Sequence, residues 1–273
     1  MRILALLCLL LPVVAFSQPT DSVIARHNHL TFESGYARLA NFDNVGSPLA
    51  YAASTAPLGG AFEYVTDSTR FTLNGSFVLS LFNASTMSDP YSSTTNFRKA
   101  YFIYANLDVR YVHALGPLFS TPVQVWVGGA FSNMAFGRRY SYDGENSSAL
   151  EGSGSGEGSS SLDATADFLY SPVPQHHLRA SVTLPIVAYI ARPAFGLWDG
   201  NASLFGFPFD GRVQVIGSFW SWRIALEYEY ELSEYFLSGI RLSDFYYHYP
   251  RFDWSSSTAE SEVSAYFSWR FHF

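Results

Sequence analysis

The residues best suited to acid–base chemistry are a histidine, a serine and two aspartates in the middle of the chain. His177 and Ser181 are four positions apart, and Asp163 and Asp167 precede them. A nucleophilic serine needs its histidine within hydrogen-bonding distance. In an extended strand the two side chains share a face but lie about 13 Å apart, because each residue advances the chain by roughly 3.3 Å. We therefore expect no Ser–His pair, whereas Asp163 and Asp167 with His177 stay open as an acid–base cluster.

Histidines also raise the question of a metal site. His176 and His177 are adjacent, and His27 and His29 lie closer to the start of the chain. Adjacent side chains of a strand point to opposite faces, so His176 and His177 do not readily bind one ion. The single cysteine falls in the leader described below, and no set of carboxylates completes a site. We predict neither a metal nor any other cofactor.

Polar and charged residues recur at every second position of several segments, which gives these segments a polar face. We expect that face to line a common interior, where opposite charges pair because each partner offsets the desolvation of the other. With a turn at residues 172–176, Asp167 is predicted to lie near Arg179, and Asp163 near Thr183. The candidate interior residues are Asn106, Asp108, Arg110, Asp163, Asp167, His177, Arg179, Glu227, Glu229 and Arg241.

The elements that position these residues are extended strands, because the dominant hydrophobic period along the chain is two. Residues 71–81 are typical: Phe71, Leu73, Phe77 and Leu79 share one face, while the other face is polar except for Val78. The pattern predicts an all-β fold with ten strands, at about 29–40, 57–66, 69–83, 97–113, 122–139, 161–171, 177–191, 212–230, 235–248 and 259–273. Several of these runs last 15 to 18 residues, well beyond the usual 5 or 6 of globular strands.

The connections between these strands alternate between long and short. We expect long ones at about 41–57, 84–95, 140–160, 192–211 and 249–258, and short ones at 66–68, 114–121, 172–176 and 231–234. The segment around 140–160 is rich in Ser, Gly and Glu and is predicted to be mobile. The parity of the 212–230 run changes near residues 220–222, which we interpret as a β-bulge. If it is instead a turn, and residues 204–209 add a strand, the count becomes twelve.

Both ends of the chain carry signals for export and membrane assembly. Arg2, an apolar stretch over residues 3–14 that contains Cys8, and small residues at 15 and 17 predict a signal peptide of residues 1–17. The last strand has one aromatic-rich face that ends at the final residue: Val263, Ala265, Phe267, Trp269, Phe271 and Phe273. This pattern resembles the C-terminal signal that the outer-membrane assembly machinery recognises. The resemblance implies a bacterial outer-membrane protein.

Together these features predict that residues 18–273 form a single closed antiparallel up-and-down transmembrane β-barrel, with the apolar strand faces toward lipid and the polar faces toward the lumen. Aromatic residues make up 18% of the chain, as interfacial girdles require, and the run Phe245, Tyr246, Tyr247, Tyr249, Phe252 and Trp254 is assigned to the outer girdle. The long loops are then extracellular, including the mobile segment at 140–160.

Three functions remain open at this stage, and no catalytic motif decides between them. The first is a small-solute, porin-like channel with a charged lumen. The second is a structural or accessory barrel that binds a partner through its extracellular loops. The third is a barrel-embedded hydrolase, a class that includes outer-membrane phospholipases, lipid A deacylases and aspartate/histidine proteases; we expect no enzyme. A net charge of −7 without a basic patch argues against nucleic acid.

Overall fold

The computed structural model describes residues 27–43, 47–84, 98–142, 154–193, 209–251 and 254–271. Their regular structure consists of twelve strands: β1 (His27–Asp43), β2 (Ser47–Thr55), β3 (Leu58–Val65), β4 (Thr69–Ala84), β5 (Arg98–Pro117), β6 (Gln124–Tyr142), β7 (Gly154–Val173), β8 (His176–Pro193), β9 (Phe209–Val215), β10 (Trp220–Ser233), β11 (Phe236–Arg251) and β12 (Trp254–Phe271). Within these residues no helix is long and apolar enough to cross a membrane. The predicted leader, residues 1–17, lies outside the described residues.

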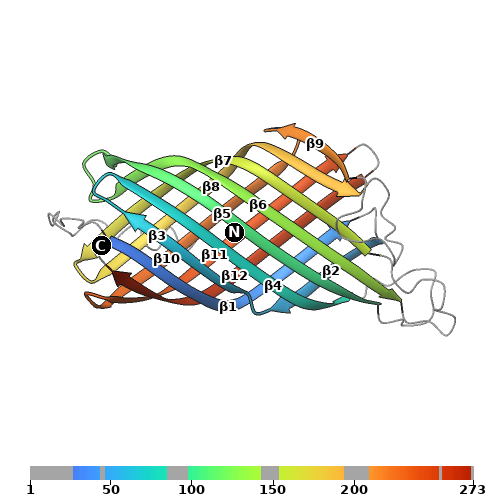
Figure 1. The fold of residues 1–273 in the computed structure, drawn as a ribbon, viewed down its shortest axis with the longest axis horizontal. Helices are drawn as coiled ribbons and strands as arrows, with labels where there is room; N and C mark the ends of the chain where they lie inside the picture. The colour runs from blue at the N-terminus through green and yellow to red at the C-terminus, as the bar shows by residue number, and fades with distance from the viewer. Residues whose placement is uncertain are drawn as a thin grey trace.

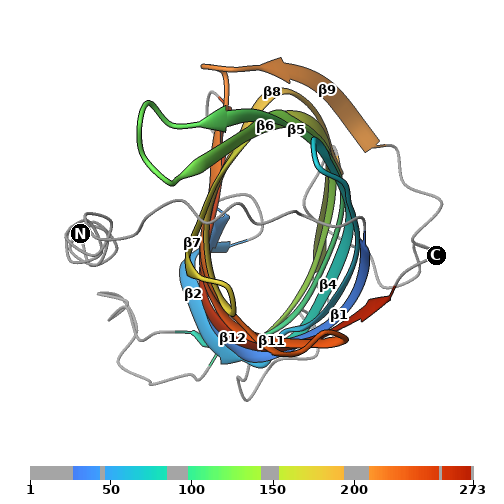
Figure 2. The same cartoon turned by 90° about the vertical axis from the view of Figure 1, so that its left-hand side faces the viewer.

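Ten of the strands form a closed ring in which every neighbour is antiparallel (Figures 1 and 2). The ring runs β1, β3, β4, β5, β6, β7, β8, β10, β11, β12, and it closes where β12 pairs with β1, from Asn28 opposite Phe271 to Asp43 opposite Ser256. The predicted all-β, up-and-down barrel of ten strands is therefore confirmed. Closure leaves no edge in the ring, so each strand finds backbone hydrogen-bond partners on both sides.

Strands β2 and β9 are additional to the ring, and both arise where a neighbouring strand is interrupted. The first half of β1 pairs with β3 and its second half with β2. In the same way β8 pairs with β10 and then with β9, which diverges from the ring in Figure 2. The predicted bulge at 220–222 is wrong. The interruption lies at residues 216–219, where Gly217 has a φ of +96° and the Ser218 amide donates to the carbonyl of Val215.

The two ends of the barrel differ, and we name them by their connections. The turn end holds the start of β1, the end of β12 and the short connections at 66–68, 118–123, 174–175 and 234–235. The loop end is the opposite one, where β4, β6, β8 and β11 end, whereas residues 56–57 and 216–219 lie within the wall. Two long connections were predicted wrongly: β2 occupies most of 41–57, and only residues 252–253 separate β11 from β12. The predicted mobile segment is shortened by β6 and β7, and its remainder, 143–153, lies outside the described residues.

Apolar side chains cover the outer face of the ring. On β4, Phe77 and Leu79 are 46% and 63% exposed, whereas Val78 between them is 1% exposed. The same holds for the predicted C-terminal pattern, of which Val263, Phe267 and Trp269 are half exposed on the outer face; Phe273 lies outside the described residues. An apolar outer surface of this extent requires a non-aqueous environment.

Candidate functional site in the barrel lumen

The lumen is apolar at the loop end. The inward side chains of this half form one buried cluster, which we call the apolar plug: Leu39, Ala53, Val78, Phe102, Tyr104, Met134, Phe136, Ala188, Ile190, Phe219, Phe245, Tyr247 and Tyr249. The Tyr104 and Phe136 rings stack with centroids 4.9 Å apart, and Phe102 packs against Phe136 at 5.6 Å. The plug draws on β1, β2, β4, β5, β6, β8 and β11 and on Phe219, so it reaches across the lumen at this level.

The aromatic girdle predicted from residues 245–254 is therefore wrong in part. Phe245, Tyr247 and Tyr249 point inward and are less than 10% exposed, while Tyr246 points outward and stacks with Trp222. Phe252 and the side chain of Trp254 lie outside the described residues. The period of two carries this information, because the odd residues of β11 share the face of Arg241, which was already assigned to the lumen.

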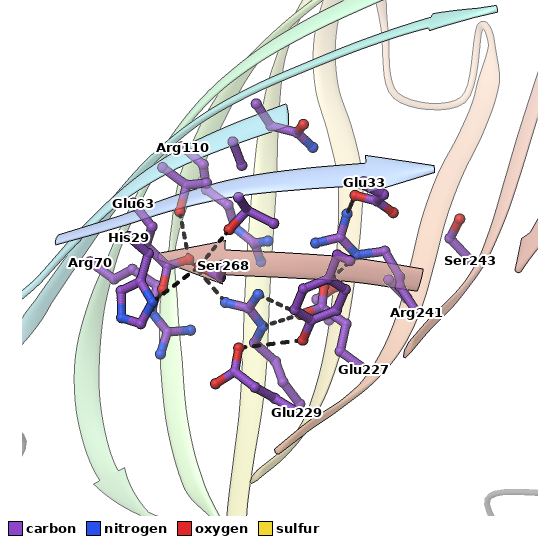
Figure 3. A pocket seen from close by; sticks show the side chains of 18 of the residues that line it. His29, Glu33, Glu63, Arg70, Arg110, Glu227, Glu229, Arg241, Ser243 and Ser268 are labelled. Carbon is purple, nitrogen blue, oxygen red and sulfur yellow. Dashed lines mark hydrogen bonds and ion pairs between the residues drawn. The ribbon is translucent and has the colours of Figure 1, made fainter. Parts of the chain in front are cut away.

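Below the apolar plug a chain of eight alternating cations and anions crosses the lumen, and Figure 3 labels six of them, from Arg110 to Glu33. Each residue comes from a different strand of the ring, and we call the set the ion-pair chain: Arg110, Asp167, Arg70, Glu63, Arg179, Glu227, Arg241 and Glu33. Strands β3 and β8 stand opposite each other in the ring, so the contact between Glu63 and Arg179 spans the lumen.

Most contacts of the ion-pair chain are charge-assisted hydrogen bonds, whereas those of Arg70 are ion pairs without a hydrogen bond. Arg179 Nη1 lies 3.1 Å from Glu63 Oε2, and its Nε lies 2.8 Å from Glu227 Oε2. Arg241 Nε donates to the other oxygen of Glu227 at 2.8 Å, and its Nη1 donates to Glu33. Arg70 connects Glu63 at 3.3 Å with Asp167 at 3.7 Å. Each carboxylate therefore offsets the desolvation cost of at least one arginine.

Aromatic faces support three of the arginines. The guanidinium of Arg70 lies 5.2 Å from the ring centroid of Trp126, and those of Arg223 and Arg241 lie 5.2 and 5.7 Å from Phe245 and Tyr266. Such cation–π contacts are stronger in a desolvated site. They fix the planes of the guanidinium groups and therefore the positions of the carboxylates bound to them.

The predicted neighbours of Asp167 and Asp163 are wrong. Asp167 pairs in register with Ser181 and binds Arg110 and Arg70, not Arg179. Asp163 lies opposite Pro185 and accepts a hydrogen bond of 2.6 Å from Ser132. The register differs by two residues from the predicted pairing: β7 and β8 are joined by a two-residue turn at 174–175 and a bulge between Tyr170 and Val173, and they place Asp167 opposite Ser181.

The expected acid–base cluster of Asp163, Asp167 and His177 does not form. His177 lies at the turn end, where its Nδ1 is 2.8 Å from Ser171 Oγ and its Nε2 is 3.4 Å from Glu231, which also binds Arg270. His176 points to the outer face and contacts Tyr228. Among the described residues no group of three His, Cys, Asp or Glu side chains is arranged to hold a metal ion.

A cavity of about 1100 Å³ extends through the lumen from the turns to the underside of the apolar plug. Eight of the ten residues predicted for the interior line it: Asn106, Asp108, Arg110, His177, Arg179, Glu227, Glu229 and Arg241. Asp163 lines a small adjoining pocket, and Asp167 is fully buried behind the ion-pair chain.

Sequence reasoning missed several charged residues of the cavity, although they lie at the expected parity of their strands. These are Glu33, Glu63, Arg70, Arg223, Glu231, Glu260, Glu262 and Arg270. Glu33, Glu63 and Arg70 are the single inward charges of their strands, so no run of alternating charges marked them. The other five share β10 or β12 with further inward charges, and the parity of these two strands could have found them.

No protein-family model matches the chain, and no curated protein matches its sequence. Among solved structures, the outer-membrane protease OmpT of Escherichia coli is similar with a TM-score of 0.52 and 9% identity, over 93% of this chain and 99% of that chain. The transport unit of the autotransporter AIDA-I of Escherichia coli has a TM-score of 0.44 at 8% identity over 97% of each chain. The toluene transporter TodX of P. putida has a TM-score of 0.33 at 8% identity, over 92% and 90%.

Identities this low establish the fold and nothing finer. The chain has the fold of the outer-membrane β-barrel proteins, and the comparison identifies no particular family within that class.

Proposed function

We propose that the protein is an integral barrel of the bacterial outer membrane whose lumen is closed, and that it acts as a structural or accessory barrel rather than as an open pore. The observation that carries this proposal is the apolar plug. A water-filled channel needs a polar interior along its whole length, whereas most inward side chains of the loop-end half belong to this buried apolar cluster, and the carboxylate of Glu157 there accepts a hydrogen bond from Tyr247.

The position of the barrel in a bilayer follows from its outer face. Exposed apolar residues cover the strands on that side, and the turn end with both strand termini is periplasmic, as the predicted export signal requires. In this arrangement the cavity opens toward the periplasm, and the connections 85–97, 143–153 and 194–208 face the cell exterior. We assign partner binding to that exterior side, because the connections there are longer than the connections of two to six residues at the turn end.

Conductance in a planar lipid bilayer tests the closed lumen. The refolded wild-type protein is expected to show no stable open-channel steps. The double variant Phe102→Ala/Phe136→Ala removes two adjoining rings of the apolar plug and is expected to conduct above the wild type. The matched control Phe77→Ala removes a ring from the outer face and should stay silent. Stable steps from the wild-type protein would contradict the proposal.

A small-solute channel is the second candidate, because the charged cavity already covers the turn-end part of a path. This function requires the apolar plug to move aside, and it predicts that an inter-strand cross-link within the plug region abolishes uptake. We do not propose an enzyme. The side chains that suggested acid–base chemistry have other partners, since Asp167 binds arginines and His177 contacts Ser171 and Glu231.

A further inference from the structure

The charges that face the cavity do not balance. Six arginines line it, and each is ion-paired with a carboxylate: Arg70, Arg110, Arg179, Arg223, Arg241 and Arg270. Three carboxylates on strands within the lumen have no arginine partner among the described residues, namely Glu229, Glu260 and Glu262. Glu229 has the hydroxyl of Tyr266 at 3.4 Å and Glu262 has that of Ser264 beside it, so Glu260 is the least compensated.

Glu260 is the most unusual of the three. It is 8% exposed, lines the cavity, and neither accepts a hydrogen bond nor forms an ion pair with any residue that the structure describes. Its neighbours in register are Leu39 of β1 and Phe245 of β11, both part of the apolar plug. Glu262 follows two residues later on the same face and also lines the cavity.

Arg223 attracts Glu260 electrostatically but forms no ion pair with it. Arg223 donates to Asp108 Oδ2 at 2.6 Å, and its guanidinium lies over the Phe245 ring. Asp108 in turn accepts from Asn106 at 2.6 Å. Arg223 is therefore held by another carboxylate on the side of β5, and Glu260 retains free acceptor positions that point into the cavity.

A buried carboxylate with free acceptor positions is costly unless a proton or another cation binds it. The cavity gives access from the turn end and has ample volume for a small molecule. We propose that Glu260, with Glu262 beside it, binds the ammonium group of a small organic cation that enters through the periplasmic end of the cavity. An alkyl chain on that cation would rest against the apolar underside of the plug, formed here by Tyr104 and Phe245.

An ammonium ion fits this site better than a divalent metal ion. Calcium takes six to eight oxygen ligands, and the described residues offer no group of three acidic or imidazole side chains. An ammonium group has three N–H donors, which two carboxylates can accept. The inference goes beyond the proposed closed barrel and does not depend on it, because the cavity is reached from the turn end whether or not the plug opens.

Calorimetric titration of the detergent-refolded full chain tests the site, with n-butylammonium chloride as the probe and sodium chloride at equal ionic strength as the reference. Saturable binding of one equivalent is expected. Glu260→Gln should weaken it at least tenfold and Glu262→Gln less. The matched control Asp244→Asn removes a carboxylate from the outward-facing side of the neighbouring strand and should leave binding unchanged.

Every other result overturns the inference. Absence of saturable binding to the wild type, or equal weakening by Glu260→Gln and Asp244→Asn, would mean that the surface charge attracts the probe without a site. If calcium chloride binds more tightly than n-butylammonium chloride and Glu260→Gln weakens its binding equally, the site is a metal site instead. The heat-modifiable gel mobility of each variant verifies that the barrel is folded, and Glu260→Asp, which keeps the charge, should bind more tightly than Glu260→Gln.

Discussion

Arg179 shows how a single side chain organises the interior of this barrel. It binds Glu227 through Nε and Nη2 and Glu63 through Nη1, and it thereby joins β8 to β10 and, across the lumen, to β3. Both carboxylates are buried, and each also contacts a second arginine. A residue that links two opposite walls acts as a cross-brace, whereas most hydrogen bonds of a barrel run between adjacent strands.

Replacement of Arg179 tests this role. Arg179→Met removes both contacts and leaves two buried carboxylates with one arginine each, so we expect unfolding in urea from lipid vesicles to become easier by about 3 kcal/mol. Arg38→Met is the control, because Arg38 is exposed on the outer face; it should change the free energy of unfolding by less than about 0.5 kcal/mol. A similar loss of unfolding free energy in both variants would show that Arg179 does not stabilise the barrel by linking opposite walls.

Partial rescue distinguishes a charge effect from a packing effect. The double variant Arg179→Met/Glu227→Gln removes one of the carboxylates left behind, and it is expected to be more stable than Arg179→Met alone. If the second substitution only adds to the loss, the contribution of Arg179 lies in the packing of its aliphatic stem.

At the scale of the elements, each strand serves two environments on its inward side. The turn-end half carries charges that bind across the cavity, and the loop-end half carries the rings of the apolar plug. Val78 illustrates this change: it is the apolar exception on the polar face of residues 71–81, and in the structure it belongs to the plug. Inward residues thus report where along the barrel axis the lumen stops being polar.

The closure of β1 on β12 depends on a close approach of main chains at Gly35. A Cβ atom at Gly35 would lie 2.2 Å from the carbonyl oxygen of Val263 and 2.5 Å from Ser264 Cα, whereas one at Gly75 would meet nothing closer than 3.8 Å. We expect Gly35→Val to lower the free energy of unfolding by about 1–3 kcal/mol or to prevent closure of the barrel. Gly75→Ala should be tolerated.

Heat-modifiable mobility on gels, followed by urea titration, measures this difference. A barrel that fails to close migrates as the unfolded chain without heating. Normal mobility and stability of Gly35→Val would show that β1 and β12 separate at this point more readily than the structure indicates.

At the scale of the whole molecule, the proposed orientation places the turn end in the periplasm. The predicted leader contains the only cysteine of the chain, Cys8, so a mature protein without it can carry single engineered cysteines. Ser147→Cys, in the connection between β6 and β7, is expected to react with a membrane-impermeant maleimide in intact cells. Gln175→Cys, in the exposed two-residue turn between β7 and β8, should react only after the outer membrane is permeabilised.

The reverse labelling pattern would show that the barrel has the opposite orientation, with the mouth of the cavity at the cell exterior. Equal labelling of both cysteines in intact cells would show that the protein does not span a sealed membrane. Recovery of the protein in the outer-membrane fraction completes the test, since an apolar outer face of this extent is not stable in water.

The sequence by itself determined the ring of ten strands and their parity, because alternation of apolar and polar residues is a local property of each strand. It did not determine the additional strands β2 and β9. The inward position of Asp108, Glu227 and Arg241 follows from parity, but their partners do not. Whether Asp167 meets Arg179 or Arg110 depends on the register of β7 against β8, and the Glu63–Arg179 contact depends on the width of the closed ring. Only the tertiary structure brings opposite walls together. It alone therefore decides which part of the lumen the apolar plug occupies, which part is bridged by arginine–carboxylate ion pairs, and which carboxylate has no ion-pair partner among the described residues.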